Sequence, residues 1–289
     1  IVVSPNPVTL APGFSQQFTA VGLDGNGNVI AINPVWTVVN GGGTISPTGL
    51  FTAGAVTGTF NNTVKATSGL TSGTATVNVT SVPPAPAPFV NLGTAALNGI
   101  MAGTAVTCVS NGLISADISV SPGNTLTGFG PCVFTGVAHL NDAVAQQNQI
   151  DLTAAYNTLA GLPCPPANFI VANLGGTTKA AGVYCSATSI GITGTLTLDG
   201  GGNPNATFVF QAGSGLTTAG DIVLINGAQA KNVYFQVGSS ATIGTASHIQ
   251  GNILALTSIT LVDNATLFGR ALARNGAVSL GTNNVITLP

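Results

Sequence analysis

A short repeat near the C-terminal end restricts the possible folds more than any other feature of this chain. Three segments share one pattern and begin 18 and 19 residues apart: Ser240–Ile243, Ser258–Leu261 and Ala277–Leu280. Two pairs of strand-like stretches follow with the same spacing: His248–Asn252 with Leu267–Arg270, and Ile253–Leu256 with Ala271–Arg274. Three short strands per turn at a fixed period predict a β-solenoid with a roughly triangular cross-section.

Alternation within each repeat divides the side chains between an inner and an outer column. Successive side chains of a strand point to opposite faces, so Thr242, Thr260 and Ser279 are expected to point outward. Two weaker repeats, Gly194–Leu198 and Gly215–Thr218, are interpreted as earlier rungs. The candidate binding residues form one outward column: Thr195, Thr197, Thr217, Ser240, Thr242, Ser258, Thr260 and Ser279. A second tier of candidates near the turn between faces consists of Thr245 and Thr266.

Such a column is a flat, stiff array of methyl and hydroxyl groups. Stacked rungs lie about 4.8 Å apart, and alternate residues of a strand about 6.7 Å apart. Thr has few side-chain rotamers, so these groups stay in place. Methyl groups order the nearest water and hydroxyl groups hydrogen-bond to it. Because Thr also has a high β propensity, the column alone leaves a purely structural role open.

The scarcity of charge excludes several classes of partner. Charged residues make up 4% of the chain, with five Lys and Arg and seven acidic residues, all Asp. Five scattered cations cannot form the clustered surface that nucleic acid or an anionic membrane requires. No stretch approaches the roughly 18 consecutive apolar residues of a membrane span. The composition therefore predicts no nucleic-acid partner and no membrane span.

The four cysteines predict disulfides rather than a metal site. Cys108, Cys132, Cys164 and Cys185 contain no C-x-x-C pair, and only two His residues accompany them. Three pairings are possible, of which we favour the sequential one, Cys108–Cys132 with Cys164–Cys185. Disulfides indicate an oxidising compartment, so we expect a secreted or extracellular protein that could also be held at the cell surface.

Residues 1–82 differ in character from the rest of the chain. Short strand-like segments separated by Gly- and Asn-rich turns are typical of a β-sandwich. Their order is similar to that of bacterial Ig-like domains of surface proteins, and the matching segments are Val3–Pro5, Gln17–Ala20, Val35–Val38, Gly49–Ala53 and Gly73–Val79. The resemblance implies an Ig-like β-sandwich over 1–82. The Pro-rich stretch 83–89 is expected to be a semi-rigid linker to a domain over 90–289.

One long helix is expected over 137–160, ended by Gly161 and Pro163. We expect Leu140, Val144 and Ile150 to lie on its apolar face. The strands Ile253–Thr257 and Ala271–Asn275 are apolar on both faces and need a cover, for which this helix is the obvious candidate.

From Val90 to Pro289 the chain resembles the microbial ice-binding protein family. The matching segments are Leu92–Ala95, Ile118–Gly123, Thr127–Phe129, Asp151–Tyr156, Leu174–Gly176, Ala181–Tyr184, Phe208–Gln211, Ile225–Ala230, Gln236–Thr245, Gly251–Ala255 and Gly269–Arg274. The resemblance implies a right-handed, discontinuous β-solenoid with an inserted helix, which adsorbs to ice through one solenoid face. It implies a non-enzymatic protein without cofactor or metal, expected to be a monomer, that gives thermal hysteresis and inhibits ice recrystallisation. On this chain, the Ser/Thr column is the candidate ice-binding surface.

Two alternatives remain at this point. A cell-surface adhesin or carbohydrate-binding solenoid would suit the Ig-like segment and the linker, but Tyr156, Tyr184 and Tyr234 are expected to be core or docking residues. A degenerate polysaccharide lyase would need clustered acids, whereas the solenoid aspartates are isolated. The segment Asp24–Asn28 is predicted to be a hairpin turn, because Val29 and Val35 stand where a calcium loop needs Gly and an acid.

Overall fold

The computed structural model describes residues 1–10, 12–80, 90–170 and 173–289, which fall into two compact units, Ile1–Pro83 and Pro84–Pro289. The predicted linker, residues 83–89, lies outside the described residues.

The first unit consists of three small sheets around one core. They are β1 (Val2–Ser4), β4 (Thr19–Leu23) and β5 (Val29–Ile30); β2 (Val8–Leu10), β10 (Thr71–Val79), β9 (Gly58–Ser68) and β6 (Val35–Val38); and β3 (Ser15–Gln17), β8 (Leu50–Ala53) and β7 (Gly43–Ile45). Phe18, Phe51 and Val64 are among the buried residues of the core. The predicted turn after β4 is confirmed, since the Asp24 carboxylate accepts hydrogen bonds from the amides of Asn26 and Asn28 and β4 pairs with β5.

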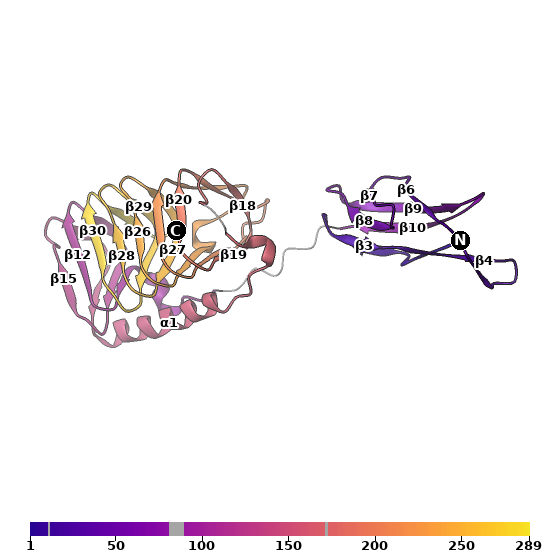
Figure 1. Cartoon of the computed structure of the whole chain (residues 1–289). Coiled ribbons are helices and arrows are strands. Elements are labelled where there is room, and N and C mark those ends of the chain that lie inside the picture. The colour runs from indigo at the N-terminus through magenta and orange to yellow at the C-terminus, as the bar shows by residue number, and fades with distance from the viewer. Residues whose placement is uncertain (11, 81–89, 171–172) are drawn as a thin grey trace. The chain divides into compact units, whose positions relative to one another are not determined.

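In the second unit, parallel strands stack in register as a β-solenoid (Figure 1). One seven-stranded sheet, here called the Ser/Thr sheet, runs in the order β15 (Thr125–Thr127), β12 (Ala105–Ser110), β30 (Val278–Thr282), β28 (Ile259–Leu261), β26 (Ala241–Ile243), β23 (Leu216–Ala219) and β20 (Ile190–Thr193). The predicted repeat is confirmed here, because Ala241 pairs with Ile259 and Ile259 pairs with Val278.

Two further sheets complete the solenoid. The larger contains β16 (Val133–Phe134), β13 (Leu113–Ser115), β31 (Val285–Thr287), β29 (Thr266–Ala273), β27 (His248–Ala255), β25 (Val233–Val237), β22 (Phe208–Ala212), β19 (Gly182–Ser186), β11 (Asn98–Ala102), β14 (Asp117–Val120) and β17 (Ala138–Leu140). The smaller contains β18 (Thr178–Ala180), β21 (Leu196–Asp199) and β24 (Ile222–Ile225). Among the described residues of this unit, short 3-10 helices lie at Gly93–Leu97, Pro166–Asn168 and Ala230–Asn232.

The stacking order does not follow the chain. Strand β12 pairs with β30, so Val106 lies beside Val278, and β15 pairs with β12. The early strands of the unit therefore extend the C-terminal end of the solenoid, and the long helix connects the two parts of the stack.

Small residues and flat rings fit the narrow interior. Strands β27 and β29 each continue around a corner at Gly251 and Gly269, where Gly251 has φ of 128° and a side chain on Gly269 would collide with the Gly251 carbonyl. Only glycine allows this close approach. Elsewhere in the core, Tyr184, Phe210 and Phe235 stack with ring centroids 5.4 and 5.0 Å apart.

Helix α1 (Ala143–Ala160) packs along one face of the solenoid (Figure 1). It begins at Ala143 rather than 137, because residues 138–140 form strand β17 and Asp142 caps the helix by accepting the Ala145 amide. The expected cover is confirmed, because one buried apolar cluster joins Leu254 and Leu272 of the solenoid with four helix residues, Leu152, Ala155, Tyr156 and Leu159.

The prediction of which helix residues form the apolar face was wrong in part. Val144 and Ile150 are 46% and 61% exposed, whereas the polar residue Asn148 is buried. Its amide donates to Ser119 Oγ, which in turn donates to Asn98 Oδ1. The buried face of the helix therefore includes a hydrogen-bonded polar residue, which the pattern of apolar residues did not predict.

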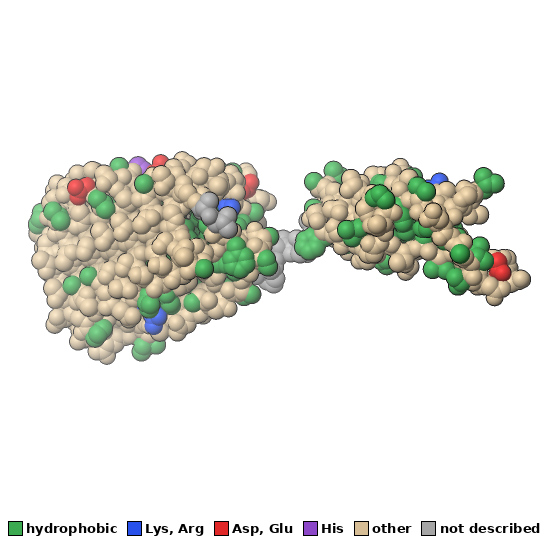
Figure 2. Space-filling view, viewed as in Figure 1, with side chains coloured by type: hydrophobic (Ala, Val, Ile, Leu, Met, Phe, Trp, Pro, Cys, Tyr) green, Lys and Arg blue, Asp and Glu red, His purple; other side chains and the backbone are tan. Residues whose placement is uncertain are grey.

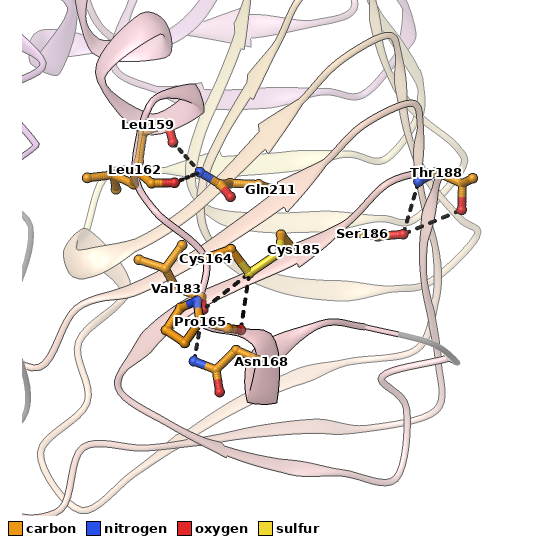
Figure 3. Close-up of a disulfide and its surroundings, with 10 residues drawn as sticks. All are labelled: Leu159, Leu162, Cys164, Pro165, Asn168, Val183, Cys185, Ser186, Thr188 and Gln211. Carbon is orange, nitrogen blue, oxygen red and sulfur yellow. Dashed lines mark hydrogen bonds between the residues drawn. A yellow bond between two sulfur atoms is a disulfide. The ribbon is translucent and has the colours of Figure 1, made fainter.

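Side-chain hydrogen bonds hold the helix to the rest of the unit in its middle and at its C-terminal end. Asp151 accepts hydrogen bonds from the amide and hydroxyl of Thr94 at 2.7 and 2.8 Å. At the C-terminal end, the Gln211 amide donates to the carbonyls of Leu159 and Leu162 (Figure 3). The Arg274 guanidinium lies 4.8 Å from the Tyr156 ring centroid, a cation–π contact that also ties the helix to the solenoid.

The two disulfides join Cys108 to Cys132 and Cys164 to Cys185, which is the sequential pairing. The second bond ties the segment after the helix to strand β19, and Asn168 donates to the Val183 carbonyl beside it (Figure 3). In the first bond, Cys108 belongs to strand β12 of the Ser/Thr sheet, and both cysteines are buried.

We expect loss of the first disulfide to destabilise the solenoid substantially. The cysteines are 24 residues apart, so closing this loop restricts the unfolded chain by about 3 to 4 kcal/mol. The variant Cys108→Ala/Cys132→Ala should unfold at a correspondingly lower urea concentration in equilibrium denaturation. An unchanged midpoint relative to the oxidised wild type would contradict this expectation.

Candidate functional site

The Ser/Thr sheet separates apolar and hydroxyl side chains because its strands alternate. Ala241, Ile259 and Val278 are buried, whereas the residues directly after them, Thr242 and Thr260, are exposed. Isoleucine, valine and threonine are stiff, β-branched residues that suit such strands. The sequence therefore builds a packed interior and a hydroxyl-bearing exterior with the same few residues.

The register of the strands aligns the outward hydroxyl residues in one row across six strands. This row, here called the Thr row, contains Thr127, Thr107, Ser279, Thr260, Thr242 and Thr217. Adjacent members are one strand spacing apart, about 4.8 Å. All are exposed except Ser279, which is half-buried and accepts a hydrogen bond from the Thr107 hydroxyl at 3.3 Å. Gly191 continues the row on β20 without a hydroxyl group.

Ser240 and Ser258 lie at the edge of the same sheet, but their hydroxyl groups face the next rung. Ser240 Oγ accepts the Ser258 amide, and Ser258 Oγ accepts the Ala277 amide, both at 3.3 Å. A serine oxygen that accepts a backbone amide helps to hold successive rungs together. These two predicted site residues therefore lie beside the Thr row, and their hydroxyl groups form hydrogen bonds within the solenoid.

The placement of Thr195 and Thr197 in the same column was wrong. Thr197 belongs to β21 in the small sheet, where it pairs with Thr178 and Val223, and Thr195 directly precedes that strand. The upstream rungs are longer, since Ile190 pairs with Leu216 and Leu216 pairs with Ala241. Extra loop residues before β22 and β25 lengthen these rungs. Counting back 18 or 19 residues from β23 therefore leads to β21 of the small sheet and not to β20 of the Ser/Thr sheet.

The two second-tier residues lie apart from the Thr row. Thr245 is exposed in the turn after β26. Thr266 begins β29 and pairs with His248 and Val285, on the neighbouring sheet. Thr245 thus borders the Ser/Thr sheet, whereas Thr266 belongs to another face.

Sequence reasoning missed Thr107 and Thr127, which form the far end of the Thr row. A signal for Thr107 was present, because the pattern Val106-Thr107-Cys108 matches Val278-Ser279-Leu280. The match spans 172 residues in sequence, far beyond the repeat period. Only the discontinuous stacking brings these segments together.

The surface of the second unit carries few charges. Figure 2 shows its visible face as mostly uncharged polar side chains and backbone, with isolated charged groups. Asp263 follows β28 of the Ser/Thr sheet and accepts the Thr282 amide at 2.7 Å. His248 Nδ1 lies 2.9 Å from Asp221 Oδ1, and this contact lowers the pKa of the Asp221 carboxyl.

Within the described residues, no group of three His, Cys, Asp or Glu side chains could hold a metal ion. None of the described helices combines the length and hydropathy needed to cross a membrane.

Hydrogen bonds lower the pKa of five of the seven aspartates, and this predicts acid sensitivity. The Ala145 amide has this effect on Asp142, the Thr94 amide on Asp151, and the others are Asp24, Asp199 and Asp221. A carboxyl with a lower pKa in the folded state stabilises the fold above its ordinary pKa, and this contribution disappears as the pH falls through the folded value. We expect the urea midpoint to fall as the pH is lowered below the ordinary aspartate pKa of 3.8, and a constant midpoint there would contradict this expectation.

Comparisons with known proteins converge on one family. The family described as ice-binding-like matches residues 100–286. An ice-binding protein of Nostoc sp. (strain HG1) is 49% identical, over 67% of this chain and 72% of that protein. Ice-binding protein 1 of Shewanella frigidimarina (strain NCIMB 400) is 32% identical over 99% of this chain, which spans 36% of that longer protein.

Solved structures agree with this match. The crystal structure of an ice-binding protein from an Antarctic biological consortium has a TM-score of 0.69 and 40% identity, covering 73% of this chain and 96% of that chain. An ice-binding protein of the Antarctic ascomycete Antarctomyces psychrotrophicus has a TM-score of 0.66 and 36% identity, covering 68% and 97%.

Proposed function

Because this chain belongs to the ice-binding-like family, we propose that it adsorbs to ice through the Thr row of its solenoid. The observation that carries the proposal is the register of six strands, which places Thr127, Thr107, Ser279, Thr260, Thr242 and Thr217 in line. Adsorbed protein stops the growth of the ice that it covers. The resulting activities are thermal hysteresis and inhibition of ice recrystallisation.

The geometry supports this function because ice is a periodic ligand. Each threonine contacts very little ice and binds weakly on its own. Once one residue of a rigid row has bound, the others are already in place, so their contacts form at high effective concentration. The strand ladder fixes the spacing between residues and β-branching restricts their rotamers.

The low charge of the surface serves the same purpose. Threonine presents a methyl group, which orders adjacent water, and a hydroxyl group, which hydrogen-bonds to it. A charged side chain would orient nearby water around itself and disturb this order. With 4% charged residues in the chain, few such groups are available to interrupt the Thr row.

The wider setting forms a second part of the proposal. The resemblance of residues 1–82 to Ig-like domains supports an extracellular location for the first unit, and two disulfides in the second unit support an oxidising compartment. The protein would act there as a secreted, non-enzymatic monomer.

Ice-crystal microscopy tests the proposed function. A single crystal held just below its melting point in a solution of the pure chain should become faceted and stop growing within a measurable temperature gap. A crystal that stays a round disc at all protein concentrations, with the solenoid folded by circular dichroism, would refute the proposal.

A further inference from the structure

A row of asparagines follows the Ser/Thr sheet at the corner where each rung turns into the neighbouring sheet. Asn111 lies between β12 and β13, Asn283 between β30 and β31, and Asn264 between β28 and β29. All three are exposed and have left-handed backbones, with φ of 53°, 58° and 60°. Asparagine is one of the few residues that adopts this conformation readily. These three residues are here called the asparagine corner.

Hydrogen bonds between the side chains align the asparagine corner along the solenoid. Asn111 Nδ2 donates to Asn283 Oδ1 at 3.2 Å, and Asn283 Nδ2 donates to Asn264 Oδ1 at 3.0 Å. The backbone repeats with the same register, since the Asn283 amide donates to the Ser110 carbonyl and the Asn264 amide to the Thr282 carbonyl. The amides therefore form a ladder with the spacing of the strands.

The asparagine corner runs parallel to the Thr row over the same rungs. Each asparagine lies four residues after a member of the Thr row; the pairs are Thr107 with Asn111, Ser279 with Asn283, and Thr260 with Asn264. On the next rung, the residue four positions after Thr242 is Ala246, which has the same left-handed backbone, with φ of 53°. The left-handed corner is thus repeated on four rungs. Three of them carry an asparagine side chain, and the fourth carries the methyl group of Ala246.

The ladder leaves part of each amide free for another ligand. A carboxamide offers two N–H donors and two acceptor lone pairs. Asn283 uses one donor and one acceptor in the ladder, so a second donor and a second lone pair remain at an exposed position. A row of such groups, one strand spacing apart, can hold a row of water molecules in register.

We propose that the asparagine corner is a second ice-contacting row, which meets a different ice plane from the Thr row. This inference rests on the proposed function. The corner lies where the Ser/Thr sheet gives way to the next sheet, so its amides face a direction that the Thr row does not cover. The protein would then bind two inclined planes of an ice crystal, one through the Thr row and the other through the asparagine corner.

The test removes the amides without disturbing the turn. Glycine adopts left-handed backbones freely, so Asn264→Gly/Asn283→Gly should keep the corner while deleting its side chains. Fluorescently labelled protein is allowed to bind a single ice hemisphere, and the stained planes are mapped. We expect the double variant to lose one of the planes that the wild type stains and to keep the other.

A matched control and a reverse variant separate recognition from stability. Asn226 is also exposed and left-handed, with φ of 50°, but follows β24 on the small sheet, so Asn226→Gly should leave the stained planes unchanged. Ala246→Asn extends the asparagine corner by one rung and should strengthen staining of the second plane. This reverse variant adds a side chain, so the test does not depend on the folding of the double glycine variant.

The outcomes distinguish this inference from the proposed function. A wild type that stains no plane would refute ice binding itself. A wild type that stains the hemisphere, with the same planes and intensities in Asn264→Gly/Asn283→Gly and in Ala246→Asn, would show that the asparagine corner only holds the turn.

Discussion

The double variant Thr242→Tyr/Thr260→Tyr is expected to lower thermal hysteresis by roughly tenfold at equal protein concentration, because binding through a row depends on many contacts formed together. Both threonines are exposed and lie on adjacent strands in the middle of the Thr row. Two tyrosine rings would project from the flat surface and hold the neighbouring hydroxyl groups away from ice. The measurement is the freezing-point gap of a single crystal.

The fold should survive this change, because both side chains point away from the core. The melting temperature and circular dichroism spectrum should match those of the wild type. Thr197→Tyr is a control on another face, since Thr197 lies half-buried within a strand of the small sheet. If the control loses activity and the double variant keeps it, the ice-binding surface is on the small sheet.

The second large effect concerns the helix. Tyr156→Ala is expected to destabilise the solenoid unit by about 3 to 5 kcal/mol, as other buried aromatic truncations do. The ring is 6% exposed, packs among the buried apolar residues between the helix and the solenoid, and lies under the Arg274 guanidinium. Calorimetry should show a melting temperature lower by roughly 10 °C for this unit.

A second variant isolates the hydroxyl group of the same residue. Tyr156 Oη donates to the Val237 carbonyl and accepts the Gln236 amide at 2.7 Å. Tyr156→Phe keeps the ring but leaves the buried Gln236 amide without its partner, while the Val237 carbonyl still accepts the Leu256 amide; this should cost about 1 to 3 kcal/mol. If the phenylalanine variant were as unstable as the alanine variant, packing of the ring would contribute little and the account of this contact would be wrong.

The C-terminal rungs were predictable because their repeat is local. A spacing of 18 or 19 residues fixes which side chains of β26, β28 and β30 face outward, and the structure agrees. The upstream rungs were harder, since their longer loops change the period between β20, β23 and β26. Thr197 was therefore assigned to the Ser/Thr column by spacing alone, although it belongs to another sheet.

Long-range stacking and polar packing explain the remaining differences between the sequence-based predictions and the structure. The pairing of Thr107 with Ser279 joins segments whose separation no local pattern reports. The helix buries Asn148 and exposes Ile150, because its inner face is selected by Ser119 and the shape of the solenoid as well as by hydrophobicity. Patterns of apolar residues cannot indicate such a partner before the fold is known.

Ice-affinity partitioning measures whether the protein binds ice through the Thr row. Wild type and Thr242→Tyr/Thr260→Tyr, labelled with different fluorophores, are mixed and exposed to a slowly growing ice front, and both labels are quantified in ice and liquid. We expect the wild type to be enriched in the ice while the variant stays in the liquid. Equal enrichment of both in the ice would contradict binding through the Thr row, and exclusion of both would contradict ice binding altogether.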